Sequence, residues 1–262
     1  MNDINHNPEQ NNAAENSPTH FGFETVSGTE KVNRVMGVFS SVASQYDIMN
    51  DAMSGGMHRL WKRKMIATAA IGAGSRVLDV AAGSGDIAIG LAKKMGPSGR
   101  VVLTDLNGPM LAEGARRVID EGLLPGRADC IQSDGTRLAF ADNSFDCVTI
   151  AFGIRNFLDI EAGLSEFYRI LKPGGQFMCL EFSRPTFPGL DVLYDAYSFN
   201  VIPFMGEKIT GDRDSYQYLV ESIRRFPDQE RFAKLIRGVG FDLVKYDNLT
   251  GGIVALHRGY KI

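Results

Sequence analysis

The strongest constraint on the fold is the alternation that begins at Arg76, where short apolar runs alternate with stretches that repeat apolar residues at helical spacing. This rhythm predicts strand–helix units around a doubly wound, mostly parallel sheet with helices on both faces, that is, an α/β fold. The expected strands are "RVLDV", "RVVLTDLN", "DCIQSD", "FDCVTIAFG" and "QFMCLEF". The expected helices are "DIAIGLAKKM", "MLAEGARRVIDEG" and "EAGLSEFYRILKPGG", the last stopped by Pro173 and two glycines.

The C-terminal end changes the pattern. An aromatic-rich insertion over 185–226 interrupts the alternation and is expected to form a lid. After one more helix, "FDLVKYDNLTGGIVALHRGYK" predicts two strands joined by residues 249–252. The sheet is therefore expected to have seven strands and to finish with an antiparallel hairpin.

The N-terminal region divides into a tail and a helical cover. Residues 1–20 are rich in Asn, Glu and Pro with almost no large apolar side chains, so a disordered tail is expected. Helices are expected over Lys31 to Ala43 and around Leu60 to Ala70. We interpret 21–262 as one domain, with 31–70 as an N-terminal helical cover.

Composition excludes several classes of function. No run approaches the roughly 18 apolar residues of a membrane-spanning helix, and a formal net charge of -3 provides no basic stripe for nucleic acid. The three cysteines are widely spaced and lie in or beside expected strands, which favours buried thiols over metal ligands. No secretory signal is recognisable at the N-terminus, so a cytoplasmic protein without a metal site is expected.

A glycine turn follows the first strand and carries the first sign of chemistry. In "LDVAAGSGD", Asp79 ends the strand, and Gly83 and Gly85 permit a tight turn that lets backbone approach a ligand. Asp105 ends the next strand twenty residues after Gly85, where its carboxylate can accept hydrogen bonds from both ribose hydroxyls. A nucleoside site follows from this arrangement.

Two nucleoside cofactors remain open at this point. Residues 83–88 also satisfy the dinucleotide pattern G-x-G-x-x-G/A, so one hypothesis is that the protein is a nicotinamide-dependent reductase. The anionic Asp86 at the helix start disfavours a pyrophosphate there. S-adenosylmethionine has no phosphate and carries a sulfonium and an ammonium, which Asp79 and Asp86 would tolerate or favour.

Further candidate contacts lie where later strands end. Asp134 could accept a hydrogen bond from the exocyclic amine of an adenine, and the backbone N–H of Gly135 could donate one to a ring nitrogen. Ala151 ends the fourth strand. Ligands of open α/β sheets bind outside the carboxyl ends of the strands, so these residues should converge with Asp79 and Asp105.

Longer motifs extend this interpretation to a family. "YDIMNDAMSGGMHRLWK", "RILKPGGQFMCLEFSRP", "YDAYSFNVIP", "DSYQYLVESI" and "NLTGGIVALHRGYK" resemble signature blocks of the ubiquinone/menaquinone biosynthesis C-methyltransferases, within the class I S-adenosylmethionine-dependent methyltransferases. The resemblance runs from about Phe39 to the C-terminus. It implies a class I, Rossmann-like fold and methylation of a ring carbon of a polyprenylated quinol. Demethylmenaquinol would give menaquinol, and 2-methoxy-6-polyprenyl-1,4-benzoquinol would give its 5-methyl derivative.

The resemblance also assigns site residues. The family's cofactor contacts fall on Ser84, Asp105, Asp134 with Gly135, and Ala151. Ser84 stands where Thr is frequent, and Ala151 stands where some members have Ser.

On the substrate side, the family reading makes Arg155 and Asn156 substrate-facing. A nearby guanidinium favours a phenolate, so we expect Arg155 to stabilise the ionised quinol. Tyr194 on the expected lid is a further candidate.

The segment from Tyr46 to Trp61 is expected to fold over the cofactor crevice and exclude water. Met49, Met53 and Met57 would supply adaptable apolar surface. His58 could touch the substrate, but a lone histidine beside Trp61 is more often a hydrogen-bonded structural residue, which is the expectation here. A long prenyl tail would be compatible with peripheral contact at the inner face of the membrane, and a quinone-biosynthesis enzyme assembly is a second partner. The alternative to an enzyme is a non-catalytic protein that organises such an assembly. Methylation of protein or nucleic acid is the least favoured function.

Overall fold

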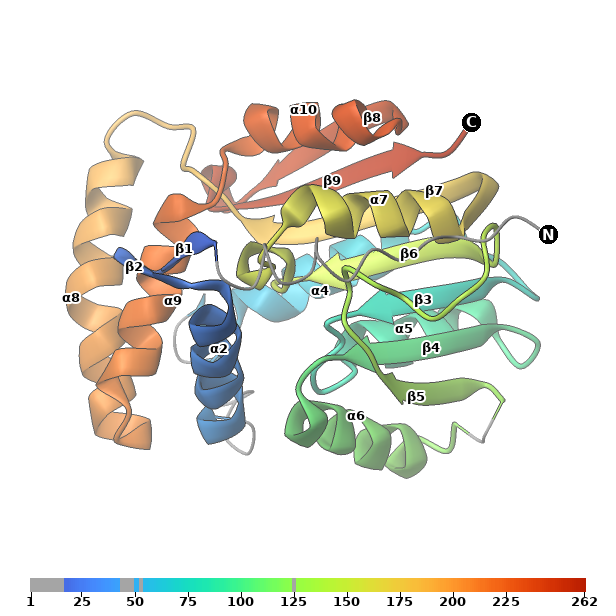
Figure 1. Cartoon of the computed structure of the whole chain (residues 1–262), viewed down its shortest axis with the longest axis horizontal. Helices are drawn as coiled ribbons and strands as arrows, with labels where there is room; N and C mark the ends of the chain where they lie inside the picture. The colour runs from blue at the N-terminus through green and yellow to red at the C-terminus, as the bar shows by residue number, and fades with distance from the viewer. Residues whose placement is uncertain (1–16, 43–49, 52–53, 124–125) are drawn as a thin grey trace.

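A seven-stranded sheet forms the centre of the protein in a computed structural model that describes residues 17–42, 50–51, 54–123 and 126–262 (Figure 1). The strand order is β5-β4-β3-β6-β7-β9-β8. Neighbours among the first five strands in this order run parallel, and β9 is antiparallel to both β7 and β8. The strands are β3 (Arg76–Val80), β4 (Arg100–Asp105), β5 (Ala128–Gln132), β6 (Phe145–Ala151), β7 (Leu171–Phe182), β8 (Asp242–Leu249) and β9 (Val254–Tyr260). The expected sheet with its closing hairpin is confirmed.

Helices cover both faces of the sheet and bury one apolar cluster on each (Figure 1). One cluster joins the sheet to α4 (Met57–Thr68), α5 (Asp86–Met95) and α6 (Gly108–Asp120). The other joins it to α7 (Ile160–Ile170) and α10 (Gln229–Val239). Cys147 and Cys179 are buried free thiols within these clusters, whereas Cys130 is half-buried.

The helix α7 ends earlier than the sequence pattern indicated. It stops at Ile170, and Leu171 already pairs with Phe145 in the sheet, so the Lys-Pro-Gly-Gly segment belongs to β7. The residue before a proline is disfavoured in the α region, which accounts for a boundary that precedes Pro173.

The expected lid insertion is a pair of helices packed side by side at the edge of the molecule, α8 (Leu190–Thr210) and α9 (Arg213–Arg225) (Figure 1). Ile202, Tyr216 and Val220 form a small core between them. Movement of this pair as a lid remains a prediction.

The N-terminal part differs from the expected tail over its last residues. Residues 1–16 lie outside the described ranges, but β1 (Pro18–Phe21) pairs antiparallel with β2 (Glu24–Ser27) ahead of α2 (Gly28–Val42). The Phe21 ring stacks on Tyr218 of α9 with ring centroids 4.0 Å apart, and the Phe23 N–H donates to Glu221 Oε2 at 2.9 Å. These contacts with α9 stabilise the hairpin, which is too short to be stable by itself.

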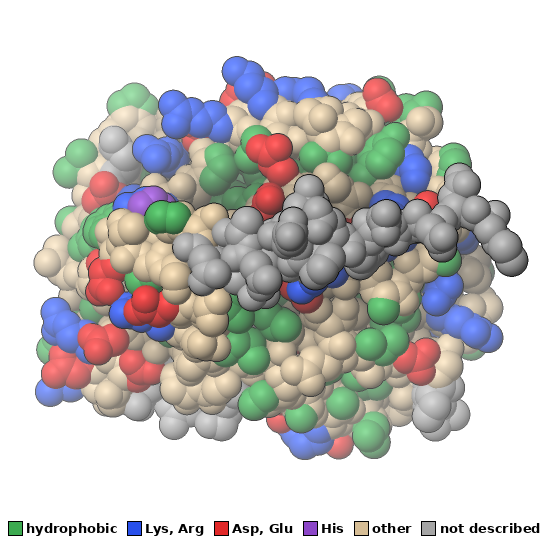
Figure 2. Space-filling view, viewed as in Figure 1, with side chains coloured by type: hydrophobic (Ala, Val, Ile, Leu, Met, Phe, Trp, Pro, Cys, Tyr) green, Lys and Arg blue, Asp and Glu red, His purple; other side chains and the backbone are tan. Residues whose placement is uncertain are grey.

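Charged side chains of both signs are interspersed over the described part of the face drawn in Figure 2. Within the described ranges, no helix is long and apolar enough to span a membrane. The same residues contain no group of three or more His, Cys, Asp or Glu placed to hold a metal ion.

Candidate active site

The first cavity, which we call the strand-end cavity, lies where β3, β4, β5 and β6 end and has a volume of about 150 Å³. Gly83 lines it in the left-handed region, with φ of 54°. Its N–H donates to Asp105 Oδ2 at 2.8 Å, and the Asn107 N–H donates to Asp105 Oδ1 at 2.8 Å. Burial raises the pKa of Asp105, and these N–H groups act in the opposite direction.

The strand-end cavity also collects the predicted adenine-side residues, Asp134, Gly135 and Ala151. Asp134 Oδ1 accepts from the backbone N–H and the hydroxyl of Thr136, each at 2.8 Å, which orders the turn. A Cβ on Gly135 would lie 2.5 Å from Phe157 Cζ, so any larger residue there would force the Phe157 side chain to shift. These residues therefore converge with Asp105 as expected, whereas Asp79 lines a separate, smaller cavity.

The cavity is closed on one side by α2, which forms part of the expected N-terminal helical cover over 31–70. Asn107 Nδ2 donates to the Met36 carbonyl at 3.1 Å and to Ser40 Oγ at 3.0 Å. Lys31 Nζ donates to the Phe157 carbonyl at 2.9 Å. These bonds hold the helix over the strand ends.

A second, small cavity of about 30 Å³ adjoins the glycine turn and is lined by Asp79, Ser84 and Lys62 among others. Asp79 is buried, and its carboxylate accepts from Thr149 Oγ1 at 2.7 Å and from the Ala88 N–H at 3.2 Å. Burial raises the pKa of Asp79 to about 7. Gly85 is absent from the described linings of both cavities, and it packs beneath the turn, where a Cβ would meet Leu103 at 3.1 Å.

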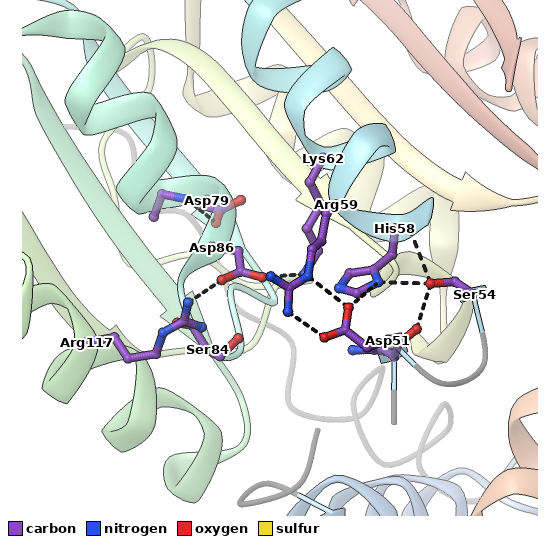
Figure 3. Close-up of polar contacts among 11 residues, drawn as sticks. Asp51, Ser54, His58, Arg59, Lys62, Asp79, Ser84, Asp86 and Arg117 are labelled. Carbon is purple, nitrogen blue, oxygen red and sulfur yellow. Dashed lines mark hydrogen bonds and ion pairs between the residues drawn. The ribbon is translucent and has the colours of Figure 1, made fainter. Parts of the chain in front are cut away.

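The charge of Asp86 is compensated, which corrects one premise of the sequence argument (Figure 3). Lys62 Nζ lies 2.6 Å from Asp86 Oδ2, and Arg117 Nη2 lies 2.5 Å from Asp86 Oδ1. Although burial acts to raise it, these cations hold the pKa of Asp86 below its usual value. Asp86 therefore presents no uncompensated negative charge to a ligand, so its charge does not disfavour a pyrophosphate at this position.

The third cavity, the aromatic cavity, has a volume of about 240 Å³ and lies between α4, α8, α9 and the ends of β6 and β7. It shares Phe39 and Phe152 with the strand-end cavity. Most of its described lining is apolar or aromatic, with members that include Met57, Trp61, Phe182, Tyr194, Tyr197, Ile202, Tyr216, Tyr218, Leu219 and Ile223.

Arg155 reaches the aromatic cavity from a short 3-10 helix, η2 (Ile154–Asn156), that follows β6. The side chain is buried, and its Nη1 lies 3.1 Å from Glu181 Oε1 and donates to the Phe152 carbonyl. Burial raises the pKa of Glu181, and the Arg155 guanidinium opposes that rise. The predicted guanidinium therefore lies at the aromatic cavity, but the Glu181 carboxylate partly neutralises its positive charge.

Sequence reasoning missed Glu181, although a signal was available. It is the single acid in the apolar strand "QFMCLEF", and a buried carboxylate needs a cation or hydrogen-bond donors close by. A search for that partner would have led to Arg155.

The structure separates the other two predicted substrate-side residues. Asn156 lines the strand-end cavity, and its Oδ1 accepts from Tyr218 Oη at 2.9 Å. Tyr194 lines the aromatic cavity with its ring under the Arg224 guanidinium, 5.0 Å from carbon to centroid. Burial raises the pKa of Tyr194.

The expected covering segment is described in part and borders the aromatic cavity. Tyr46, Met49 and Met53 lie outside the described residues. Trp61 is buried, and its Nε1 donates to Thr250 Oγ1 at 2.8 Å, which ties α4 to the 3-10 helix η3 (Thr250–Gly252) between β8 and β9. Lys62 and Thr250 are cavity residues that sequence reasoning did not identify.

Comparison with solved structures identifies the fold. A methyltransferase solved with the Haloferax volcanii Trm112 activator superposes with a TM-score of 0.61 at 18% identity, covering 85% of this chain and 97% of its own. The [4+2]-cyclase SpnF superposes with a TM-score of 0.63 at 16% identity, covering 87% of this chain and 94% of its own. Because a cyclase shares the architecture, this likeness is evidence for the fold alone.

Sequence comparison is more specific. The chain is 56% identical over 244 residues to the ubiquinone/menaquinone biosynthesis C-methyltransferase UbiE of Dinoroseobacter shibae, covering 93% of this chain and 97% of that protein. It is 51% identical over 243 residues to the UbiE of Pseudomonas fluorescens, covering 93% and 94%. The profile of the ubiE/COQ5 methyltransferase family matches residues 25–261. On this evidence the chain belongs to the ubiE/COQ5 methyltransferase family.

Proposed function

We propose that this protein transfers a methyl group from S-adenosylmethionine to a ring carbon of a polyprenylated quinol, in ubiquinone or menaquinone biosynthesis or in both. The proposed substrates are demethylmenaquinol and 2-methoxy-6-polyprenyl-1,4-benzoquinol. The observation that carries the proposal is the meeting of two unlike cavities at Phe39 and Phe152, one with nucleoside-binding groups and one apolar with a buried guanidinium. The names of its relatives support the same reaction.

The residues at the strand ends fit S-adenosylmethionine. The Asp105 carboxylate accepts from the backbone N–H groups of Gly83 and Asn107 and keeps lone pairs on its two oxygens for ribose hydroxyls. The small cavity offers the Asp79 carboxylate and the Lys62 ammonium, a pairing that suits the ammonium and carboxylate of an amino acid. When bound, this cofactor supplies an electrophilic methyl group on a sulfonium.

The aromatic cavity suits a reduced and ionised ring. A quinone is too electron-poor to attack the methyl group, whereas a quinol that loses a hydroxyl proton becomes a good carbon nucleophile. An unperturbed phenol has a pKa of ~10 and is scarcely ionised at neutral pH. Arg155, held by Glu181 at the wall of the cavity, would lower the phenol pKa by favouring the anion. We assign Arg155 to this role, with Asn156 and Tyr194 as neighbouring contacts.

The outer face of α8 supports peripheral contact with the inner face of the membrane as part of this proposal. Val192 is 70% exposed and Phe204 is 52% exposed, while Tyr194 and Ile202 of the same helix line the aromatic cavity. A prenyl tail that leaves the cavity past α8 would meet this apolar surface. A protein of a quinone-biosynthesis assembly is the alternative occupant, and a liposome flotation assay with Val192→Glu and Phe204→Glu distinguishes the two.

An anaerobic assay tests the reaction. The protein receives labelled S-adenosylmethionine with either reduced quinol, and label in one or both products supports the proposal. Arg155→Gln should lower the methyl-transfer rate about 100-fold or more, whereas Arg237→Gln, at an exposed position of α10, should not. Absence of label from every quinol, in protein shown to bind S-adenosylhomocysteine, would contradict the proposed function and favour a non-catalytic role.

A further inference from the structure

A chain of hydrogen bonds at the start of α4 fixes the protonation of one imidazole (Figure 3). Ser54 Oγ donates its single proton to the Asn50 carbonyl, 2.6 Å away. The same oxygen lies 2.9 Å from His58 Nδ1, so it must accept there, and Nδ1 carries the proton. The Nε2 atom of the neutral ring is then left with a free lone pair.

The unprotonated nitrogen is open to the aromatic cavity. His58 lines that cavity, and its side chain is only 8% exposed. Among the described residues Nε2 has no hydrogen-bond partner, yet it is not one of the fully enclosed unpaired atoms. A ligand in the cavity is therefore a natural partner for this lone pair.

The surroundings keep the ring neutral at rest and tolerate its charge. Burial, followed by the nearby Lys62 ammonium, lowers the pKa of His58. Asp51 Oδ1 lies 3.8 Å from Nδ1 and acts in the opposite direction, while Arg59 and Asp86 make smaller contributions. Asp51 is held in place by Arg59 Nε at 2.8 Å. An imidazolium formed in the reaction would thus face a fixed carboxylate.

The other ionisable groups of the described cavity lining are poor proton acceptors. Arg155 and Lys62 are cations paired with Glu181 and Asp86. The tyrosines that carry a resolved shift, Tyr194, Tyr197 and Tyr218, have raised pKa values, so they hold their protons. No Asp or Glu occurs among the described lining residues.

We propose that His58 is the general base of the reaction and that its Nε2 removes the hydroxyl proton of the bound quinol. The inference rests on the proposed function and adds the group that generates the nucleophile. Arg155 stabilises the resulting phenolate, and Ser54 and Asp51 are positioning residues. The sequence predicted a hydrogen-bonded histidine, and the structure shows its bond to Ser54; the proposal adds a catalytic role to it.

The proton inventory balances. The quinol O–H bond breaks with its electron pair left on oxygen, and the proton forms a new N–H bond at Nε2. After methylation the ring carbon releases its proton to water, and the oxygen regains one from the imidazolium. Each turnover then releases one proton and returns His58 to its neutral state.

Single-turnover rates over pH 5.5 to 9 test the assignment. His58→Gln should lower the rate about 10²- to 10⁴-fold and abolish the decrease in rate at acid pH, with S-adenosylhomocysteine affinity changed less than about threefold. Imidazole added to His58→Ala should restore part of the rate, which a structural role would not predict. His20→Gln, on the exposed β1 strand, is the matched control. A His58→Gln rate within about threefold of wild type would overturn the proposal, as would an inactive His58→Ala that imidazole does not rescue.

A second readout is independent of turnover. In protein labelled with ¹⁵N-histidine at pH 7.5, the His58 signals should show protonated Nδ1 and unprotonated Nε2, and Ser54→Ala should shift this tautomer balance. Protonation at Nε2 in wild type would overturn the assignment whatever the substrate. If wild type has the expected tautomer but methylates no quinol, the proposed function is contradicted. The role of His58 as a base is then contradicted with it.

Discussion

The strand-end cavity and the aromatic cavity share a wall but are built in opposite ways. The first is formed by neighbouring strand ends of one sheet beneath α2, and its Asp105 carboxylate is held by backbone N–H groups. The second is formed by helices and loops far apart in the chain, and its charges are compensated by other side chains, as in Arg155 with Glu181. Under the proposed function, cofactor recognition would be mainly a property of the backbone fold, whereas substrate recognition would depend on a few side-chain pairs.

The largest effect should come from breaking the pair on the aromatic side. Glu181→Ala leaves the buried Arg155 charge without its partner, so the free energy of unfolding should fall by about 3–5 kcal/mol. Urea denaturation measures the change. The double variant Arg155→Met/Glu181→Met should recover most of it, because no buried charge remains. A loss below about 1 kcal/mol in the single variant would mean that the guanidinium finds another partner.

The corresponding change at the strand ends should have the opposite sign. The pKa of Asp79 is about 7 in the folded protein, above the ordinary value of 3.8, so the folded state holds this proton more tightly. Ionisation of Asp79 therefore destabilises the fold increasingly as pH rises from about 4 to 7, by up to about 4 kcal/mol above pH 7.

Asp79→Asn removes that penalty, so the ligand-free variant should be more stable than wild type at pH 8, by up to about 4 kcal/mol, and equally stable near pH 4. Its affinity for S-adenosylmethionine should fall. Denaturation at both pH values and calorimetric titration test the two statements, and a variant less stable than wild type at pH 8 would show that the carboxylate contributes favourably without ligand.

Loss of the proposed ribose contact should affect ligand binding only in the strand-end cavity. Asp105→Ala removes a charged acceptor and should weaken S-adenosylhomocysteine binding by about 1.5–3 kcal/mol, roughly 10- to 150-fold. Binding of a short-chain quinol analogue should be unchanged when measured separately by fluorescence quenching. Equal loss of both ligands would show that the two cavities form one cooperative unit.

The smallest effect concerns the bond that ties α4 to η3. Trp61→Phe keeps an aromatic ring but removes the donor to Thr250 Oγ1, which should lower the free energy of unfolding by about 0.5–1.5 kcal/mol. Thr250→Val should cost a similar amount in thermal denaturation. If the double variant costs the sum of both single changes, the two residues do not act through this bond.

Sequence reasoning predicted the strand-end side well because its signals are local. A strand followed by a glycine turn positions Gly83, and an acid at the next strand end positions Asp105. Parallel strands bring their ends together without further information. The C-terminal hairpin could also be predicted from sequence, since its turn lies between two strand-like runs.

The aromatic cavity was harder to predict because the residues that contact one another there are distant in sequence. The Trp61–Thr250 and Arg155–Ser222 contacts join residues 189 and 67 positions apart. No periodicity specifies such pairs. Asp86 shows the same limit, since its charge could be interpreted only after Lys62 and Arg117 were placed beside it.

The β1–β2 hairpin has a consequence for the order of folding during synthesis. Its residue Phe23 bonds to Glu221, 198 positions later in the chain, and Phe21 stacks on Tyr218. A ribosome adds about 5–20 residues per second, so the hairpin emerges roughly ten to forty seconds before α9 exists. The first elements made are thus expected to dock among the last, and the nascent chain would complete its aromatic cavity only after nearly all of the protein has been translated.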